Sequence, residues 1–374
     1  MAKRITYQSD IGNRETEQKL KELEKKIRDE YTKASKELEA KTKDYLERFE
    51  KKDSIRKDYL AKQYDEYLNG KISFNDYKAM QEEYKQWRIG QVAVGKRWEE
   101  MRNTMAEDLT ETYSKARGMI EGYMPEVYAL NHNYATFQVE KSSLVNTSYS
   151  LYDAHTVERL IKENPRLLPN YKFGSVTYER MRQKNLRWNQ QKITSAITQG
   201  ILQGESIPKI AKRMRDAGYM EYKASIRDAR TSITSAQNAG RIEAMHRAED
   251  LGIKMMKQWL ATIDDRTRHE HRELDGQRVP IDEPFEVEGY EIMYPADPSG
   301  DPEMVYNCRC TMIQVFDGYD KKITDFDIDD RLGGMSYEDW KESRDINSDP
   351  IDKQERIAEA ERNRYNEEYR RMSR

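Results

Sequence analysis

The stretch that decides the fold runs from Lys257 to Val315. It begins KQWLATIDDRTRHEHRELDGQRVP (residues 257–280), passes through the proline-rich YPADPSGDPEM (294–304) and closes on NCRCTMIQV (307–315). It contains both cysteines of the chain, two of its five histidines and five of its ten prolines. Chemically reactive side chains are concentrated here, so a site encoded by the sequence is expected in this stretch.

Short strand-like runs alternate with turns in this stretch. Residues of high β-propensity occur around Trp259, at 278–281, at 285–294 and again at 308–316, and Leu274-Asp275-Gly276 is a turn signal. We therefore expect a small α+β module over residues 257–317.

The two cysteines and one histidine form a candidate metal site. If the C-x-C segment is a strand, Cys308 and Cys310 lie on the same face of it. Together with His271 they would supply three ligands suited to zinc, with Asp265 or His269 as a possible fourth.

Two other roles for these residues stay open. Free cysteines are often buried as small apolar side chains, which would make the pair structural without a metal. A thiol beside a histidine is also a candidate nucleophile, but the sequence has no glycine-rich loop suited to an oxyanion or a phosphate. This lack favours a structural role over catalysis.

The preceding residues 178–256 are helical and basic. Helices are predicted over 189–203, over 205–218 and over 222–252, the second with Ser206 as N-cap and Gly218 as C-cap. Between residues 172 and 257 there are 17 Lys and Arg against 8 Asp and Glu. The first two helices fit either a helix-turn-helix or a helix pair with an exposed basic face, and both allow nonspecific contact with DNA phosphates.

The N-terminal residues 1–125 predict an elongated helical hairpin or bundle. Between residues 14 and 50 the apolar positions follow a 3-4-4 spacing, an eleven-residue period typical of a long helix with one narrow apolar stripe. The stripe consists of Leu20, Leu23, Ile27, Tyr31, Ala34, Leu38, Thr42, Tyr45 and Phe49. A stripe this narrow needs a partner helix, expected from residues 54–117, as in a coiled coil.

The remaining segments are less regular. Residues 126–177 predict an irregular connector with one short helix at 157–164, because prolines interrupt the region and its flank at Pro125, Pro165 and Pro169. Residues 318–374 predict an acidic linker followed by a charged C-terminal helix, with 10 Asp and Glu against 5 Lys and Arg up to residue 350.

Composition limits the class of protein. The chain has 374 residues, 36% of them charged, a net charge of −3 and a mean hydropathy of −1.06, too polar for one large core. It has no apolar run long enough for a membrane span and no apolar N-terminal signal segment, so we expect no membrane contact. Two cysteines cannot build a disulfide framework, which favours assembly in a reducing cytoplasm.

The order of rare residue types between 259 and 310 resembles the phage minor head proteins, the head-morphogenesis or Mu F-like family. The residues that carry the resemblance are Trp259, Asp265, Arg268, His271, Leu274, Asp275, Gly276, Asn307, Cys308, Arg309 and Cys310. The helices from residue 190 onward, including Ala229-Arg230-Thr231, extend it to residues 190–315. The family pattern specifies His271 and leaves His269 unspecified, which weakens His269 as a ligand. Ser232 stands where the family often has glutamate.

The resemblance implies a non-enzymatic virion component of mainly α fold with a small α+β module. Such a protein is made in the host cytoplasm and associates with the portal protein and procapsid components. It acts in head assembly and in DNA packaging or ejection, without a small-molecule substrate. Two alternatives remain: a metal-dependent hydrolase or nuclease using His271, Cys308 and Cys310, and a helix-turn-helix DNA-binding protein.

Overall fold

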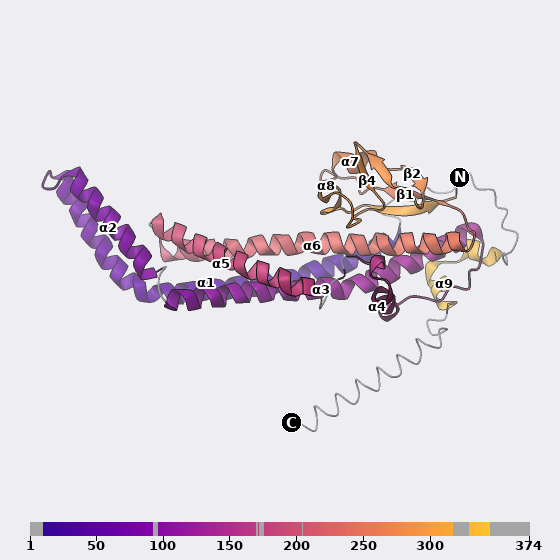
Figure 1. The fold of residues 1–374 in the computed structure, drawn as a ribbon, viewed down its shortest axis with the longest axis horizontal. Helices are drawn as coiled ribbons and strands as arrows, with labels where there is room; N and C mark the ends of the chain where they lie inside the picture. The colour runs from indigo at the N-terminus through magenta and orange to yellow at the C-terminus, as the bar shows by residue number, and fades with distance from the viewer. Residues whose placement is uncertain are drawn as a thin grey trace, which may run out of the picture. The chain divides into compact units, whose positions relative to one another are not determined.

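The computed structural model describes residues 10–92, 96–169, 171, 176–203, 205–316 and 329–344. Long helices dominate it, and two small antiparallel sheets lie within residues 256–315 (Figure 1). The predicted fold class, mainly α with a small α+β module, is therefore confirmed. Among the described residues, no helix is both long enough and apolar enough to cross a membrane.

The chain divides into two compact units, each assembled from separate segments. The first unit comprises residues 1–22, 120–171 and 227–374, and the second comprises residues 23–119 and 172–226. These boundaries cut the three longest helices, α1 (Ile11–Leu68), α3 (Lys96–Ser143) and α6 (Ile207–Asp250). The predicted linear divisions at residues 125, 177 and 256 do not coincide with them, because each long helix contributes buried faces to both units.

In the second unit, the predicted apolar stripe of α1 is buried. Leu38, Tyr45, Leu46 and Phe49 pack into one core with residues of α3, α5 (Val176–Leu202) and α6. The partners are Trp98, Met105, Ala106, Leu109, Ile193, Ile197, Ile201, Ile210 and Met214. Helices α3, α5 and α6 thus cover the apolar stripe, which is too narrow to form a stable core by itself.

Helix α1 extends beyond residue 50, where its predicted apolar stripe ends, and forms a helical hairpin with the next helix. Helix α1 ends at Leu68, Gly70 takes φ 72° in the turn, and α2 (Phe74–Val92) follows. Ser73 caps α2: its Oγ accepts from Asp76 N at 3.2 Å, and Asp76 Oδ2 accepts from Ser73 N at 3.3 Å.

Helices α5 and α6 form an antiparallel pair in the second unit. Asn185 Nδ2 lies 3.5 Å from Glu221 Oε1, and Gly200 lies against Ile210 nearer the turn. Helix α6 does not end at Gly218 as predicted; a Cβ there would lie 3.2 Å from Ser35 Oγ, so this glycine permits close packing on α1. The arrangement fits the helix pair within a bundle better than a helix-turn-helix.

The prediction of an irregular connector at 126–177 is wrong for its first part. Helix α3 continues to Ser143 with Pro125 inside it, because the residues that follow are buried. Met124, Val127, Tyr128 and Ala135 are each at most 1% exposed, and this burial outweighs the backbone hydrogen bond that proline cannot donate. The predicted short helix exists as α4 (Ala154–Glu163), followed by the 3-10 turn η2 (Pro165–Leu167).

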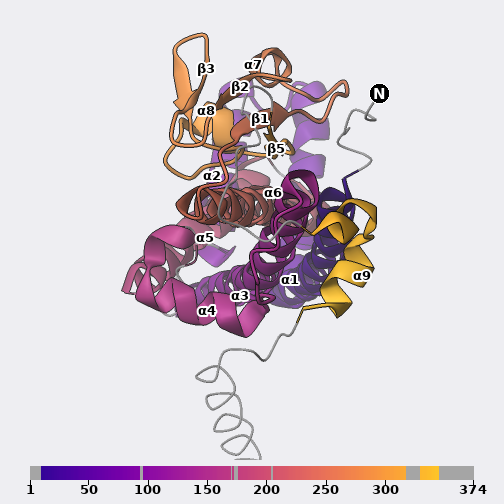
Figure 2. The same cartoon turned by 90° about the vertical axis from the view of Figure 1, so that its right-hand side faces the viewer.

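The α+β module lies along α6 in the first unit (Figures 1 and 2). Strand β1 (Met256–Leu260) is the centre of an antiparallel sheet in the order β2-β1-β5, flanked by β2 (Arg278–Pro280) and β5 (Thr311–Val315). Strands β3 (Phe285–Val287) and β4 (Tyr290–Ile292) form a separate hairpin. Two short helices, α7 (His269–Glu273) and α8 (Pro302–Val305), complete the module.

A short C-terminal segment packs against α3 in the first unit. It consists of η3 (Asp330–Gly334) and α9 (Tyr337–Glu342), whose Tyr337 and Trp340 are buried. Trp340 Nε1 donates to Glu140 Oε2 at 2.6 Å. Much of the predicted acidic linker, and all of the predicted C-terminal helix beyond 344, lie outside the described residues.

Lys257 is a fully buried cation at the centre of the sheet. Its Nζ donates to Ile281 O and Met293 O, both at 2.8 Å. Burial lowers the pKa of Lys257 to about 8, because desolvation disfavours the charged amine.

Replacing Gly240 with alanine should destabilise the first unit. A Cβ at this position would overlap Tyr128 O on α3 and lie 3.2 Å from His132 N, so the helices would have to separate. We expect a loss of about 1–3 kcal/mol in unfolding free energy, measured by urea denaturation. The matched control is Gly122→Ala in α3, where a Cβ meets nothing within 4 Å; it should be neutral or stabilising by up to about 1 kcal/mol. Equal effects at both positions would contradict the close packing of α6 on α3.

Lys257→Met should remove a specific pH dependence of stability. Because the folded pKa is lowered to about 8, the unfolded chain binds more protons between that pH and its own pKa near 10.4. Wild-type stability should therefore rise relative to Lys257→Met across this window, by at most about 1.4 kcal/mol per pH unit. Urea denaturation between pH 7.5 and 10 measures it in steps of about half a unit. Lys254→Met at an exposed position is the control, and the same slope in both variants would refute the assignment.

Candidate metal centre

The centre is formed by one helix and one loop of the α+β module. His271 lies in α7, and Cys308 and Cys310 lie in the loop between α8 and β5. Asp301 caps α8 by accepting from Glu303 N at 2.9 Å, and Asn307 turns the chain with φ 55°. The cysteines precede β5, so the predicted strand alternation is wrong; the loop itself brings the thiols together.

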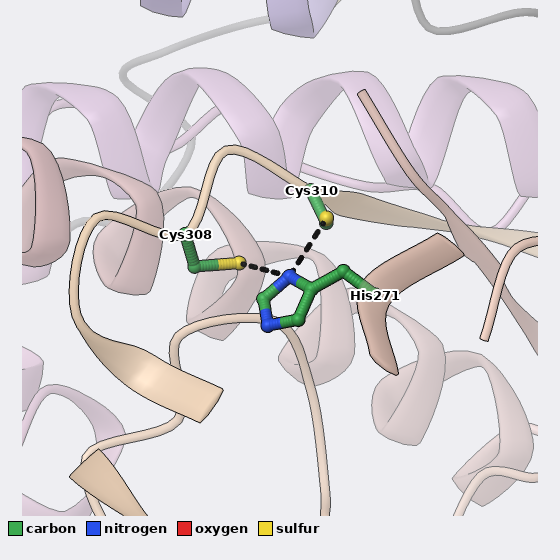
Figure 3. A group of neighbouring side chains, drawn as sticks. All are labelled: His271, Cys308 and Cys310. Atoms are coloured by element: carbon green, nitrogen blue, oxygen red, sulfur yellow. Dashed lines mark hydrogen bonds between the residues drawn. The ribbon is translucent and has the colours of Figure 1, made fainter. Parts of the chain in front are cut away.

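The three side chains converge on one nitrogen atom. His271 Nδ1 lies 3.3 Å from Cys310 Sγ and 3.8 Å from Cys308 Sγ, and the imidazole faces the gap between the two sulfurs (Figure 3). All the potential ligand atoms lie within 4.8 Å of one another. No side chain of the three is more than 2% exposed, so the centre is closed to bulk solvent.

The geometry fits tetrahedral zinc. With bonds of about 2.3 Å to sulfur and 2.0–2.1 Å to nitrogen, the nitrogen–sulfur edge of a tetrahedron is about 3.6 Å. The observed distances of 3.3 and 3.8 Å lie on either side of that value. The three predicted ligands are therefore placed together.

The two residues considered as a fourth ligand are not part of the centre. Asp265 is exposed, and His269 instead lies 3.1 Å from Glu273 and 3.7 Å from Glu288 at the surface. For His269 the cause is the short helix α7, in which it points in a different direction from His271, two residues on. Within the described residues, the group around His271 contains three potential ligands.

Electrostatics distinguish the two thiols. Burial raises the pKa of Cys308 well above its usual range. Burial also opposes ionisation of Cys310, but hydrogen bonds from Cys308 and His271 outweigh it and hold the pKa of Cys310 well below its usual range. Of the two thiols, Cys310 is therefore the one that ionises more readily.

Arg268 determines the tautomer of His271. Its guanidinium NH2 lies 3.3 Å from His271 Nε2, and its NH1 donates to Tyr306 O at 2.8 Å. Because a guanidinium can only donate, Nε2 accepts, and the imidazole proton resides on Nδ1 facing Cys310. Without a metal, the centre is a hydrogen-bonded thiolate–imidazole cluster.

The remaining motif residues build the wall around the centre. Trp259 packs edge-on against His271 at 5.7 Å between ring centroids and against Phe285 at 5.2 Å. Gly276, at φ 85°, donates its N–H to Trp259 O at 2.9 Å, and Asp275 Oδ1 accepts from Ala261 N at 2.9 Å. Leu274 is fully buried beneath this turn. The Leu-Asp-Gly turn therefore fastens α7 to β1.

Of the Asp264-Asp265 pair, it is Asp264, and not the Asp265 named in the sequence analysis, that is bonded to Arg309. Both carboxylate oxygens of Asp264 accept from Arg309, each at 2.6 Å, and this hydrogen bonding holds the pKa of Asp264 well below its usual range. Asp264 Oδ1 also accepts from Arg266 N at 2.9 Å, an Asx turn. That turn, followed by Thr267, was the signal in the sequence that could have identified Asp264.

A polar face of α6 holds the cysteine loop in place. Thr234 Oγ1 donates to Cys308 O at 3.0 Å, and Asn238 Nδ2 donates to Cys310 O at 3.2 Å. Thr231 Oγ1 accepts from Asn307 N at 3.1 Å. These three α6 residues were not identified as site residues, although their spacing of three and four places them on one helix face.

The comparisons with known proteins cover the segment of the chain that forms this centre. The family model described as "Phage Mu protein F like protein" matches residues 191–313, which contain α6, the centre and the α+β module as far as the middle of β5. The chain is similar to the minor head protein GP7 of Bacillus phage SPP1, at 28% identity over 230 residues, 59% of this chain and 69% of that protein.

A second relative has a different name. The chain is 36% identical over 155 residues to "NAD(+)--arginine ADP-ribosyltransferase EFV" of Enterococcus faecalis, 41% of this chain and 32% of that protein. The chain thus spans about a third of the length of this relative. No solved structure matches the chain at a significant level.

The resemblance to phage minor head proteins is confirmed. Residues 191–313, which include the His–Cys–Cys cluster, match the phage Mu protein F like family model.

Thr234→Val should weaken the attachment of the cysteine loop to α6. The substitution keeps the shape of the side chain but removes the hydroxyl that donates to the buried Cys308 O. We expect a loss of about 1–3 kcal/mol in unfolding free energy by urea denaturation. Thr194→Val is the control, since that hydroxyl bonds within its own helix to Gln190 O, and it should change stability by less than about 0.5 kcal/mol. A neutral Thr234→Val would mean that the bond does not hold the loop.

Proposed function

We propose that this chain is a minor head protein of a phage. It is made in the host cytoplasm, becomes a virion component and acts with the portal protein and procapsid components in head assembly. The observation that carries the proposal is the similarity to the SPP1 minor head protein, which covers 230 residues and 69% of that protein. It extends beyond the segment that the family model matches, so helical regions outside the module contribute to it.

A structural role fits the centre better than catalysis. His271, Cys308 and Cys310 are at most 2% exposed, so a substrate could not reach the thiolate without opening the module. The hydrolase or nuclease alternative therefore has less support than the structural one. The name of the Enterococcus relative describes that protein, of which this chain spans about a third, and we propose no transferase activity here.

The α1–α2 hairpin of the second unit is a candidate surface for a protein partner. Tyr64, Tyr67, Phe74 and Tyr77 form a ring cluster with centroid separations of 5.4–6.2 Å. Phe74 is 58% exposed and Leu68 63% exposed, and apolar patches of this kind are typical of protein interfaces. We propose that the hairpin contacts a portal or procapsid component.

Direct DNA binding has weaker support. Two of the basic residues counted between 172 and 257, Arg241 and Lys257, are fully buried and bonded within the first unit. The exposed remainder supports at most nonspecific contact with phosphates, which would weaken steeply with salt. A role in DNA packaging or ejection would then act through the assembled head.

The proposal is tested with the cognate phage and its portal protein. Mass spectrometry of purified virions should detect the chain, and a nonsense mutation in its gene should yield heads that lack it and infect poorly. In sedimentation, the purified chain should move with portal oligomers. A chain absent from virions and left at the top of the gradient would overturn the proposal.

Two variants make the same experiment specific to the hairpin. Leu68→Asp and Phe74→Asp place charges on exposed apolar positions, so they should reduce co-sedimentation by about tenfold or more without lowering the melting temperature. The control is Leu251→Asp, at a 42% exposed position in the first unit. Transfer of ADP-ribose from NAD to an arginine acceptor would contradict the non-enzymatic part of the proposal.

A further inference from the structure

We propose that His271, Cys308 and Cys310 bind one zinc ion that fastens the cysteine loop to α7. Figure 3 shows the imidazole facing both sulfurs, with Nδ1 as the ligand atom. This inference is independent of the role in the phage head.

The hydrogen bonds around the sulfurs support thiolate ligands rather than apolar cysteines. Both sulfurs lie within hydrogen-bonding distance of His271 Nδ1, Cys310 Sγ at 3.3 Å and Cys308 Sγ at 3.8 Å. Bonds of this kind stabilise negative charge on a metal-ligating sulfur and fix its direction. A cysteine buried only as a small apolar side chain needs no such donors.

The ligand set selects the metal. Two thiolates and one imidazole are soft to intermediate donors, which suit zinc and exclude calcium and magnesium, since these prefer oxygen. Two thiolates also neutralise the ion's double charge, so the centre can be buried without a net charge of its own. Among the described residues the group supplies three ligands, which leaves the fourth position to water or another small ligand.

Binding reverses the tautomer of His271. Nδ1 must give up its proton to coordinate, and Nε2 then carries the proton towards Arg268. Arg268 NH1 keeps Tyr306 O as an acceptor at 2.8 Å, so the guanidinium remains anchored when NH2 loses its partner on the ring. The change of tautomer is therefore a signature of the bound metal.

The ion would connect three elements. His271 belongs to α7, the cysteines belong to the loop before β5, and that loop is bonded to Thr234 and Asn238 of α6. Loss of the ion should loosen the module while the long helices stay folded.

Metal content of the full-length chain tests the proposal. Protein purified without chelators under reducing conditions should contain about one zinc ion per chain by elemental analysis. Cobalt replacement should give a thiolate-to-metal charge-transfer absorption and the visible bands of a tetrahedral site. Nitrogen-15 NMR should show the His271 proton on Nε2 with metal and on Nδ1 after chelation.

Variants locate the site. Cys308→Ser and Cys310→Ser should each reduce zinc affinity by at least about tenfold, whereas His269→Ala in the exposed His269–Glu273–Glu288 group should retain the full content. Circular dichroism checks that the helices remain folded. If a serine variant does not fold, the wild-type chain still decides the question: removing zinc with a chelator should lower its melting temperature, and adding zinc back should restore it.

Three results would overturn the proposal. In the first, the reduced, metal-free chain takes up no cobalt. In the second, a Cys308–Cys310 disulfide forms in place of metal binding. In the third, His269→Ala loses as much zinc as the cysteine variants do. The first result would leave the hydrogen-bonded cluster as the only state of the centre.

Discussion

The buried ion pair between Arg241 and Asp10 is the interaction on which the first unit depends. Arg241 NH2 lies 2.5 Å from Asp10 Oδ1, and both side chains are at most 1% exposed. The same guanidinium donates to Asn131 Oδ1 and to Met312 O, each at 3.0 Å. One side chain on α6 thus connects the residue before α1, helix α3 and strand β5. Because removing one partner of such a pair leaves an uncompensated buried charge, the cost is about 3–5 kcal/mol, and the four segments must assemble together.

Helix α6 serves both the bundle and the module because its two halves have different side chains. In its first half, Ile210 and Met214 enter the core of the second unit. In its second half, small and polar residues replace them: Gly240 allows α3 to approach, and Asn238 bonds to the backbone of the cysteine loop. A large apolar side chain at position 240 would separate α6 from α3, and one at position 238 would separate α6 from the module. The module therefore packs on a helix surface of small and polar side chains, several of which bond to it, which fits the alanine, serine and threonine content of α6.

The sequence allowed the periodic elements and the reactive residues to be predicted, but not the long-range pairings. The stripe on α1 depends on local spacing and was predicted correctly. The course of α3 through Pro125 depends on burial against distant segments, which a local proline signal cannot reveal. At the centre, residue types identified His271, Cys308 and Cys310, whereas the choice between Asp264 and Asp265 depended on where Arg309 lies after folding. Residue type is enough to predict which side chains are candidates for the site. Which of two neighbouring residues takes part depends on contacts that form only on folding.

The burial of the His–Cys–Cys centre separates two explanations of why reactive residues are concentrated in residues 257–315. A catalytic thiolate needs access for its substrate, whereas a structural ligand needs protection from solvent and competing ligands. Here Trp259 covers one side of His271, and the loop that carries the cysteines is bonded to α6 through Thr234 and Asn238. The sulfurs that these contacts hold in place are also at most 2% exposed. The same residues that make the centre suitable for a buried ion therefore make it unsuitable for turnover.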